Sequence, residues 1–302
     1  MVMAAVPVAA EENSPIQSGL KLAVKNALAG TASAIAEAQA APAAPTKPNS
    51  GNITFTSNFE LLPGTAYVFR GITQESDPEV TMWPSGDVGF ALHSSDTGAL
   101  RTVSVNTGVW NSLHTGSSGL DSASGKLHYE EDYYATLTLA FSKASFATTY
   151  TAYTSPNGGV GTNHEIAFKI SPTYRYGPYV LLAQELSGGA DAGPNEGTYL
   201  ELGLAGPSWA VRAGKFSVAV PVKLGLSLND YYEHPITGED HAFGFFDIGV
   251  LVTVPISKVS SSYGSWNFHI GGDILWFGDT TKYFNNDEST KGLFSFGFGF
   301  TY

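Results

Sequence analysis

The sequence contains no cysteine and little charge. Of its 302 residues only 14% are Asp, Glu, Lys or Arg, against roughly 25% in typical soluble domains. The absence of Cys excludes a disulfide-stabilised scaffold. The net charge of −12 argues against a nucleic-acid-binding protein, which would carry a basic patch. We therefore expect no nucleic-acid partner.

Long apolar runs are also missing. A membrane-spanning helix needs about 20 consecutive apolar residues, and the longest such run here is Met1–Ala10. What the chain does have is 34 Gly and an aromatic content of 13%. A disordered chain would be poor in aromatic residues. The remaining class is a large, β-rich protein that places apolar side chains on its outer surface.

The first 50 residues differ from the rest of the chain. Met1–Ala10 is apolar and ends in small residues, like the cleavage end of a secretory signal peptide whose basic start is missing. Lys21–Ala40 fits a second signal of this kind, and the alternative is an Ala-rich amphipathic helix from Ile16 to about Gln39. Ala41–Gly51 contains three prolines and is typical of a linker. We predict an N-terminal segment over residues 1–50 and a β-barrel over residues 51–302.

From residue 52 onward, apolar and small polar residues alternate. Between Lys215 and Asn229 every second residue from Phe216 to Leu228 is apolar. A period of two places these residues on one face of a strand and the intervening ones on the other. The alternating runs match the about 9–11 residues that a tilted strand needs to cross a bilayer. They predict lipid-facing apolar residues and a lumen lined by small polar residues.

The chain is predicted to form an all-β fold, an antiparallel transmembrane β-barrel of about 12 strands preceded by the short Ala-rich helix and linker. Short turns alternate with long polar loops, which is typical of outer-membrane barrels and places both termini at the short-turn side. Trp266 and Trp276 lie at the two ends of one apolar face, as expected for residues at two membrane interfaces. The predicted strands are residues 64–74, 82–93, 99–111, 129–142, 145–154, 163–174, 178–186, 197–205, 213–228, 242–256, 263–277 and 291–302.

The last predicted strand carries aromatic residues at alternate positions up to Tyr302. This pattern resembles the C-terminal signal that the barrel assembly machinery recognises in outer-membrane proteins. We therefore predict Phe298, Phe300 and Tyr302 as an assembly signal and that machinery as a partner. The alternative is a core strand that happens to end the chain. In a closed barrel, the last strand would pair with the first.

Near the start of the predicted barrel the chain reads Tyr67-Val68-Phe69-Arg70-Gly71-Ile72-Thr73-Gln74. This run resembles the opening signature of the TorF-type outer-membrane porin family, bacterial proteins assigned to the outer membrane on sequence grounds. Beyond it the likeness is confined to Gly- and Tyr-rich β segments and the terminal aromatic residue. The resemblance implies a barrel fold and an outer-membrane location rather than a substrate. The long Ala/Pro-rich N-terminal segment departs from the short leader usual in this family.

Function is expected in the lumen, where acidic residues outnumber basic ones. This excess predicts either an acidic constriction that favours cations or ion pairs that brace the wall, such as Lys223 between Glu201 and Asp247. We predict a porin of the bacterial outer membrane for passive diffusion of small solutes, favouring cations and needing no cofactor. A belt at one height is expected from Arg70, Asp87, Glu201, Lys223, Asp247 and Asp273. The full set of predicted pore-lining residues adds Asp132, Glu165, Lys169 and His269 to this belt.

Two other functions stay open. A non-conducting barrel would serve surface display or envelope structure, with acidic loops binding cations that bridge lipopolysaccharide. The second alternative is an outer-membrane hydrolase. However, none of the seven His lies in an H-E-x-x-H motif, and the sequence contains no G-x-S-x-G motif. The acidic and His residues at 233–241 match no standard metal spacing. We therefore expect no catalytic residues and no metal, and as partners the lipid bilayer with lipopolysaccharide and small solutes or ions.

Overall fold

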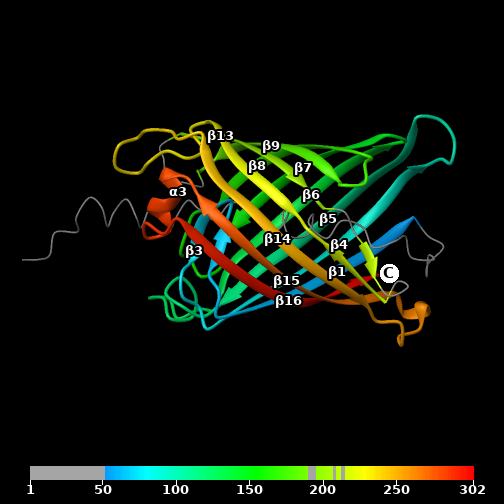
Figure 1. Cartoon of the computed structure of the whole chain (residues 1–302), viewed down its shortest axis with the longest axis horizontal. Helices are drawn as coiled ribbons and strands as arrows, with labels where there is room; N and C mark the ends of the chain where they lie inside the picture. Colours follow the sequence, from blue (N-terminus) through cyan, green and yellow to red (C-terminus); the bar gives the residue numbers. More distant parts are fainter. Residues whose placement is uncertain (1–51, 190–194, 207–208, 212–214) are drawn as a thin grey trace, which may run out of the picture.

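The computed structural model describes residues 52–189, 195–206, 209–211 and 215–302. The predicted signal peptide, helix and linker lie outside these residues. The described residues form a closed antiparallel barrel of 12 strands (Figure 1). Its strands are β1 (Ile53–Pro63), β4 (Val80–Ser94), β5 (Leu100–His114), β6 (His128–Phe141), β7 (Ala144–Thr154), β8 (Asn163–Pro172), β9 (Pro178–Ser187), β10 (Thr198–Leu204), β12 (Phe216–Ala219) continued by β13 (Val222–Asn229), β14 (Phe243–Pro255), β15 (Ser265–Phe277) and β16 (Thr290–Thr301).

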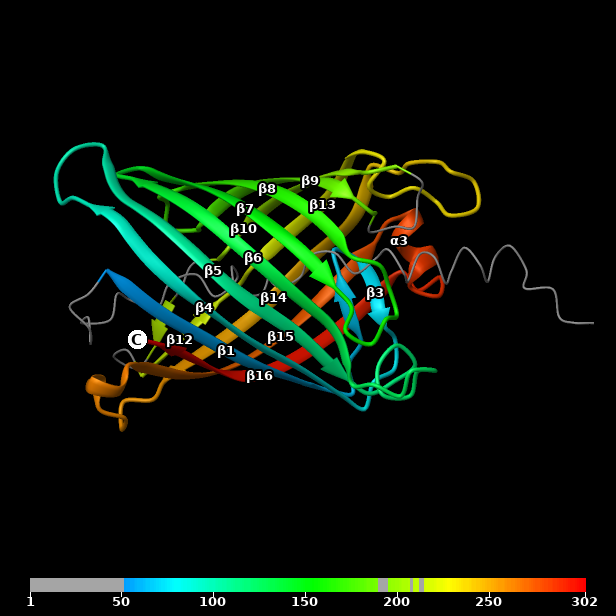
Figure 2. The same ribbon diagram turned by 180° about the vertical axis from the view of Figure 1, so that it is seen from behind.

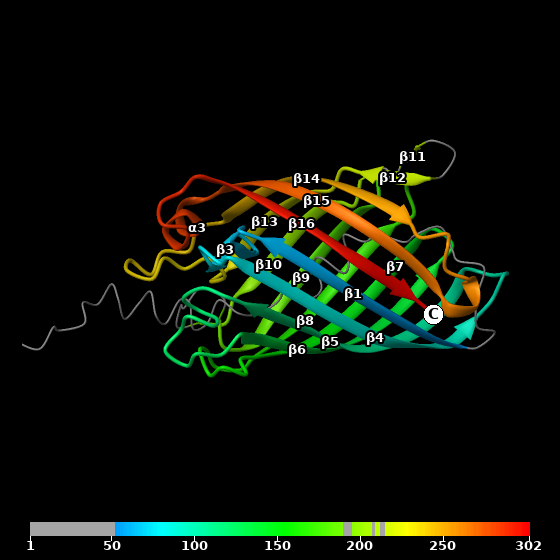
Figure 3. The same ribbon diagram turned by 90° about the horizontal axis from the view of Figure 1, so that it is seen from below.

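The barrel closes between its first and last strands. β16 pairs with β15 on one side and with β1 on the other (Figure 3). Backbone hydrogen bonds of 2.8 Å join Tyr302 and Phe55 in both directions. On β16, Phe298 is exposed on the outer face. The predicted pairing of the last strand with the first is confirmed, whereas recognition by the assembly machinery stays a prediction.

The prediction of a first barrel strand at residues 64–74 is wrong. β1 precedes it, and residues 64–79 instead carry a separate two-stranded hairpin of β2 (Tyr67–Phe69) and β3 (Ile72–Glu75). β1 has the alternation of a wall strand, because Phe55 and Phe59 are exposed while Glu60 is buried. In β2 and β3 every residue is buried, which a wall strand with one lipid face cannot provide.

The predicted strand at residues 213–228 is interrupted. Its two halves, β12 and β13, are separated at Val220 and Pro221, and both pair with β14. Proline has no backbone N–H to donate to the sheet, so the hydrogen-bond ladder breaks there. A short extra strand, β11 (Trp209–Val211), pairs with β12 and is not counted among the twelve wall strands.

The outer surface of the barrel is apolar, as the alternation predicts. On β15, the alternate residues Trp266, Ile270, Ile274 and Trp276 are all exposed. Similar exposed apolar side chains cover the other wall strands, which is the surface that a lipid-facing barrel requires. No helix in the described part of the chain is long and apolar enough to cross a membrane.

A lysine on this surface should be costly in a bilayer. Ile270 lies near the middle of β15, between the two Trp residues, so we expect Ile270→Lys to destabilise the inserted barrel by about 2–4 kcal/mol. The free energy of unfolding from lipid vesicles measures this. Ser295→Lys is the matched control, because Ser295 pairs with the residue after Ile270 and faces the lumen. Equal losses in the two variants would contradict a lipid-facing position for Ile270.

The two ends of the barrel differ. The connections at residues 95–99, 142–143, 173–177 and 256–264 lie at one end, here called the turn end, together with the C-terminus (Figure 1). The opposite end, the loop end, carries the hairpin, the longer connections and the short helix α3 (Asp279–Phe284). The predicted alternation of short and long connections is therefore present.

Candidate functional site in the lumen

The hairpin of residues 64–79, called here the lumenal hairpin, folds into the barrel from the loop end (Figure 2). Tyr67, Phe69 and Ile72 are each no more than 1% exposed. Its tip is Arg70-Gly71, where both residues have a positive φ, 41° and 81°. This conformation is unusual for a non-glycine residue and marks a position held by its surroundings.

The lumen is filled at the loop end and open at the turn end. On β5 the inward side chains of Trp110, Ser112 and His114 are buried, whereas Ser104 and Asn106, nearer the turn end, are only half-buried. The inward residues of the neighbouring strands β6 and β7 change in the same way. The hairpin therefore closes one end of the lumen and leaves a vestibule at the other.

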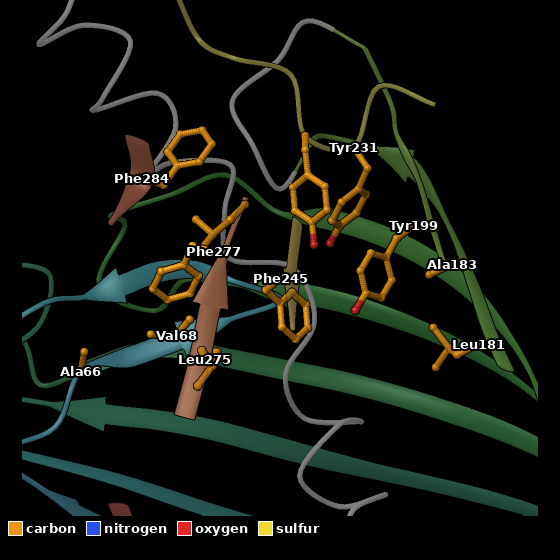
Figure 4. Close-up of a cluster of buried hydrophobic side chains, with 12 residues drawn as sticks. Ala66, Val68, Leu181, Ala183, Tyr199, Tyr231, Phe245, Leu275, Phe277 and Phe284 are labelled. Atoms are coloured by element: carbon orange, nitrogen blue, oxygen red, sulfur yellow. The ribbon is translucent and has the colours of Figure 1, made fainter. Parts of the chain in front are cut away.

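Two aromatic clusters hold the hairpin in place. Tyr67 and Phe69 pack on one side, where the rings of Tyr67 and Trp83 meet edge to face at 5.1 Å between centroids. Val68 and Ile72 pack on the other side (Figure 4). The residues of this second cluster include Tyr199, Tyr231, Tyr232, Phe245, Leu275, Phe277 and Phe284. Much of the chain's aromatic content therefore fills the lumen rather than facing lipid.

Arg70 links the hairpin tip to the opposite wall. Its guanidinium donates two hydrogen bonds, of 2.7 and 3.0 Å, to the carboxylate of Glu165 on β8. It also donates to the Tyr231 hydroxyl at 2.8 Å and lies 4.2 Å from the centre of the Tyr199 ring. Burial by itself lowers the pKa of Arg70, but the charge of Glu165 outweighs it and holds the pKa above its usual value. The two parallel N–H···O hydrogen bonds make this a bidentate guanidinium–carboxylate pair.

Further hydrogen bonds attach the hairpin around its circumference. The Tyr67 hydroxyl donates to Glu130 on β6 at 2.6 Å. On the other side, Asn285 donates from its amide to the Gly71 carbonyl at 2.7 Å and bonds to Thr73. These contacts come from strands and loops far apart in the chain, so they form only when the barrel has closed.

A cavity of about 130 Å³ lies below the hairpin tip. Five of the six residues predicted to form a belt line it: Arg70, Glu201, Lys223, Asp247 and Asp273. The sixth, Asp87, lies elsewhere on the wall and accepts hydrogen bonds from Thr56 and Asn106. The apolar part of the lining includes Leu62, Phe69, Trp83, Phe245 and Leu275.

The predicted brace around Lys223 forms only in part. Its ammonium pairs with Asp247 at 3.0 Å. Glu201 instead accepts hydrogen bonds from the hydroxyls of Tyr179 and Tyr199, at 2.7 and 2.6 Å. The tyrosines therefore replace the expected Lys223–Glu201 contact.

The other predicted lumen residues occupy different surroundings. Asp132 and Glu165 are buried near the hairpin, away from the cavity lining. The Lys169 ammonium lies 4.2 Å from the centre of the Tyr179 ring. His269 contacts the Glu60 carboxylate across β16. All of the predicted wall residues face inward, but they do not form one ring.

On the inner face of the barrel wall, the sequence reasoning missed three buried acids, Glu60, Glu130 and Glu185. Glu130 shares the inward parity of Asp132 on β6, and Glu185 shares that of Leu181 and Ala183 on β9, so alternation alone could have identified both. Glu60 lies on β1, which the predicted strands omitted, although the alternation of Phe55 and Phe59 with polar residues marks its inward face.

Glycines on the inner wall make room for these charges. A Cβ atom at Gly249 would overlap the Asp273 carboxylate, which lies across β14 at this point. A Cβ at Gly297 would approach the His269 Nε2 at 2.7 Å and the Glu60 Oε2 at 2.9 Å. Glycines at inward-facing positions of the wall strands therefore let large polar side chains lie flat against the wall.

The acidic loop at residues 233–241 is tied into the loop end. Asp240 accepts a hydrogen bond from Ser227 at 2.7 Å, and His241 bonds to Thr280 at 2.8 Å. Across the residues that the structure describes, no group of three or more His, Cys, Asp or Glu side chains is placed to hold a metal ion.

No family model matches the chain. No curated protein matches it. Among solved structures it is similar to an outer-membrane channel from Pseudomonas putida F1, with 12% identity, 86% of this chain and 99% of that chain covered, and a TM-score of 0.42. It is also similar to the transport unit of the autotransporter AIDA-I from Escherichia coli, with 9% identity, 94% of this chain and 97% of that chain covered, and a TM-score of 0.43. For outer membrane phospholipase A from Escherichia coli the identity is 9%, the coverage is 93% of this chain and 97% of that chain, and the TM-score is 0.41. Such values carry no argument about activity.

Proposed function

We propose that this chain is a bacterial outer-membrane β-barrel that passes small cations by diffusion, closed at the loop end by the lumenal hairpin in this conformation. The observation that carries the proposal is the charge of the cavity. Four carboxylates line it, those of Glu60, Glu201, Asp247 and Asp273, and only two cationic side chains, Arg70 and Lys223. Arg70 is already paired with Glu165, which is not part of the lining. The remaining excess of negative charge favours cations, as carboxylate rings do in cation channels.

The route would run from the turn end into the cavity. The vestibule there is lined by half-buried small and polar side chains such as Ser104, Asn106 and Thr136. Beyond the cavity the hairpin blocks the way, so passage would require the hairpin to move. The lumen of a twelve-strand barrel is intermediate in width and can hold a movable hairpin. A barrel of about eight strands is filled by its own side chains, whereas one of about 16–18 strands leaves an aqueous channel.

The outer-membrane location rests on the apolar outer surface and on the resemblance of residues 67–74 to the TorF-type porins. In this proposal the barrel's partners are the lipopolysaccharide-containing bilayer, the barrel assembly machinery and small cations. No residue is assigned a catalytic role.

A non-conducting barrel for display or envelope structure is the second candidate. The observation that favours it is the density of contacts around the hairpin, which is buried on both faces and held by a charged pair. Such a plug would make the barrel a rigid carrier for its outer loops.

Reversal potentials in planar bilayers test the first proposal. We expect the full-length protein, reconstituted under a potassium chloride gradient, to show small currents whose reversal potential reports preference for potassium, because the cavity carries excess negative charge. A preference for chloride would overturn the proposal.

A further inference from the structure

The cavity below the hairpin tip is lined by both charged and apolar side chains. Asp247 on β14 and Asp273 on β15 lie on neighbouring strands, where Asp273 pairs with Gly249, two residues beyond Asp247. Phe69 on the lumenal hairpin and Phe245 on β14, two residues before Asp247, belong to the same lining. A molecule that complements this mixed lining needs a polar head and an apolar stem.

The charges of the cavity are not balanced from within. Lys223 pairs with Asp247, and His269 lies against Glu60. Glu201 accepts two tyrosine hydroxyls, which bring no charge. Asp273 lies outside the Lys223 ion pair, so the cavity keeps negative charge at low dielectric, where it attracts a cation strongly.

One carboxylate oxygen in this cavity also lacks a hydrogen-bond donor. Asp247 is 4% exposed, and its Oδ2 accepts from Lys223. Its Oδ1 is buried and has no hydrogen-bond partner within the described residues. A buried acceptor without a donor is costly, and a donor placed in the cavity would relieve that cost. This second observation is independent of the charge count and points to the same kind of ligand.

We propose that the cavity binds a small organic cation of the alkylammonium class. The ammonium group would lie between Asp247 and Asp273 and donate to the free oxygen of Asp247, while the alkyl stem would lie against Phe69 and Phe245. A volume of about 130 Å³ suits such a molecule, since a protein cavity of roughly 150 Å³ holds benzene. The absence of three convergent metal-ligating side chains in the described region favours an organic cation over a metal ion. The inference names the substrate class of the proposed channel and rests on that function for its role in transport.

Calorimetric titration of the full-length protein in detergent micelles tests this site. The probe is n-propylammonium chloride, and the controls are n-propanol, which has the stem without the charge, and potassium chloride, which has a cation without the stem. We expect saturable binding for n-propylammonium alone. This comparison uses the unaltered protein and does not depend on the folding of a variant.

Asp273→Asn should weaken n-propylammonium binding about tenfold, because it removes one charge-assisted hydrogen bond. Asp279→Asn makes the same chemical change on α3, where the side chain is exposed, and should leave the affinity unchanged. Equal binding of n-propanol, or an unchanged affinity in Asp273→Asn, would overturn the inference.

The two proposals fail separately. Cation-selective currents without binding of n-propylammonium would support the proposed channel and overturn the organic-cation site. Saturable, Asp273-dependent binding in a barrel that stays sealed even without its hairpin would support the site and overturn the channel.

Discussion

Excision of the lumenal hairpin should raise the conductance of the barrel many-fold. Pro63 and Val80 are directly paired at the end of β1 and β4, and Gly64 donates to the carbonyl of Glu79 at 2.9 Å. A two-residue Asn-Gly turn can therefore replace residues 64–79 without moving either strand. The wall would stay closed while the loop half of the lumen loses its filling. Single-channel recording in planar bilayers measures the change.

The control for this excision is a similar shortening at the turn end. Residues 257–263 are exposed and lie between β14 and β15, so trimming them should leave the conductance as it was. Heat-modifiable gel mobility checks that both variants are folded barrels. A folded barrel that still passes no ions after excision of the hairpin would favour the structural or display function.

Arg70→Ala should have the largest effect on stability of any single substitution at the hairpin. It leaves the Glu165 carboxylate buried without its cation, and breaking a buried ion pair from one side costs about 3–5 kcal/mol. It also removes the donor to Tyr231. Denaturant unfolding of the barrel in detergent gives the loss in free energy, and limited proteolysis shows whether the hairpin is released first.

The exposed pair of Lys282 and Asp279 provides the comparison for Arg70→Ala. Its atoms are 3.5 Å apart and the side chains are 38% and 78% exposed. Exposed pairs contribute about 0–1 kcal/mol, so Lys282→Ala should change little. The double variant Arg70→Met/Glu165→Met should recover much of the stability, because apolar residues can replace a buried ion pair. If Arg70→Ala costs no more than Lys282→Ala, the pair does not hold the hairpin.

Alternation identified most of the wall. Each wall strand faces lipid with one parity and the lumen with the other, so a local pattern with a period of two carries the information. Asp247 and Asp273 were placed inward by this rule, and both line the cavity. The same rule could have identified Glu130 and Glu185, whose parity is equally clear.

Alternation failed where a segment is buried on both faces. Residues 67–75 are rich in strand-forming residues, and their β structure was predicted correctly, but they belong to the hairpin rather than the wall. A short strand surrounded by lumen side chains has no lipid face and therefore no period to read. The break at Pro221 was a missed local signal, since proline removes a donor from the ladder.

By itself the sequence determined the class of the protein: an antiparallel barrel of about twelve strands, apolar outside, small and acidic inside, with loops at one end and turns at the other. Only the tertiary structure decided that the lumen is closed at the loop end. Arg70 meets Glu165, and the cavity collects acids from β1, β10, β14 and β15, because barrel closure brings together residues far apart in the chain. Such contacts depend on the shape of the whole barrel, and no local pattern encodes them.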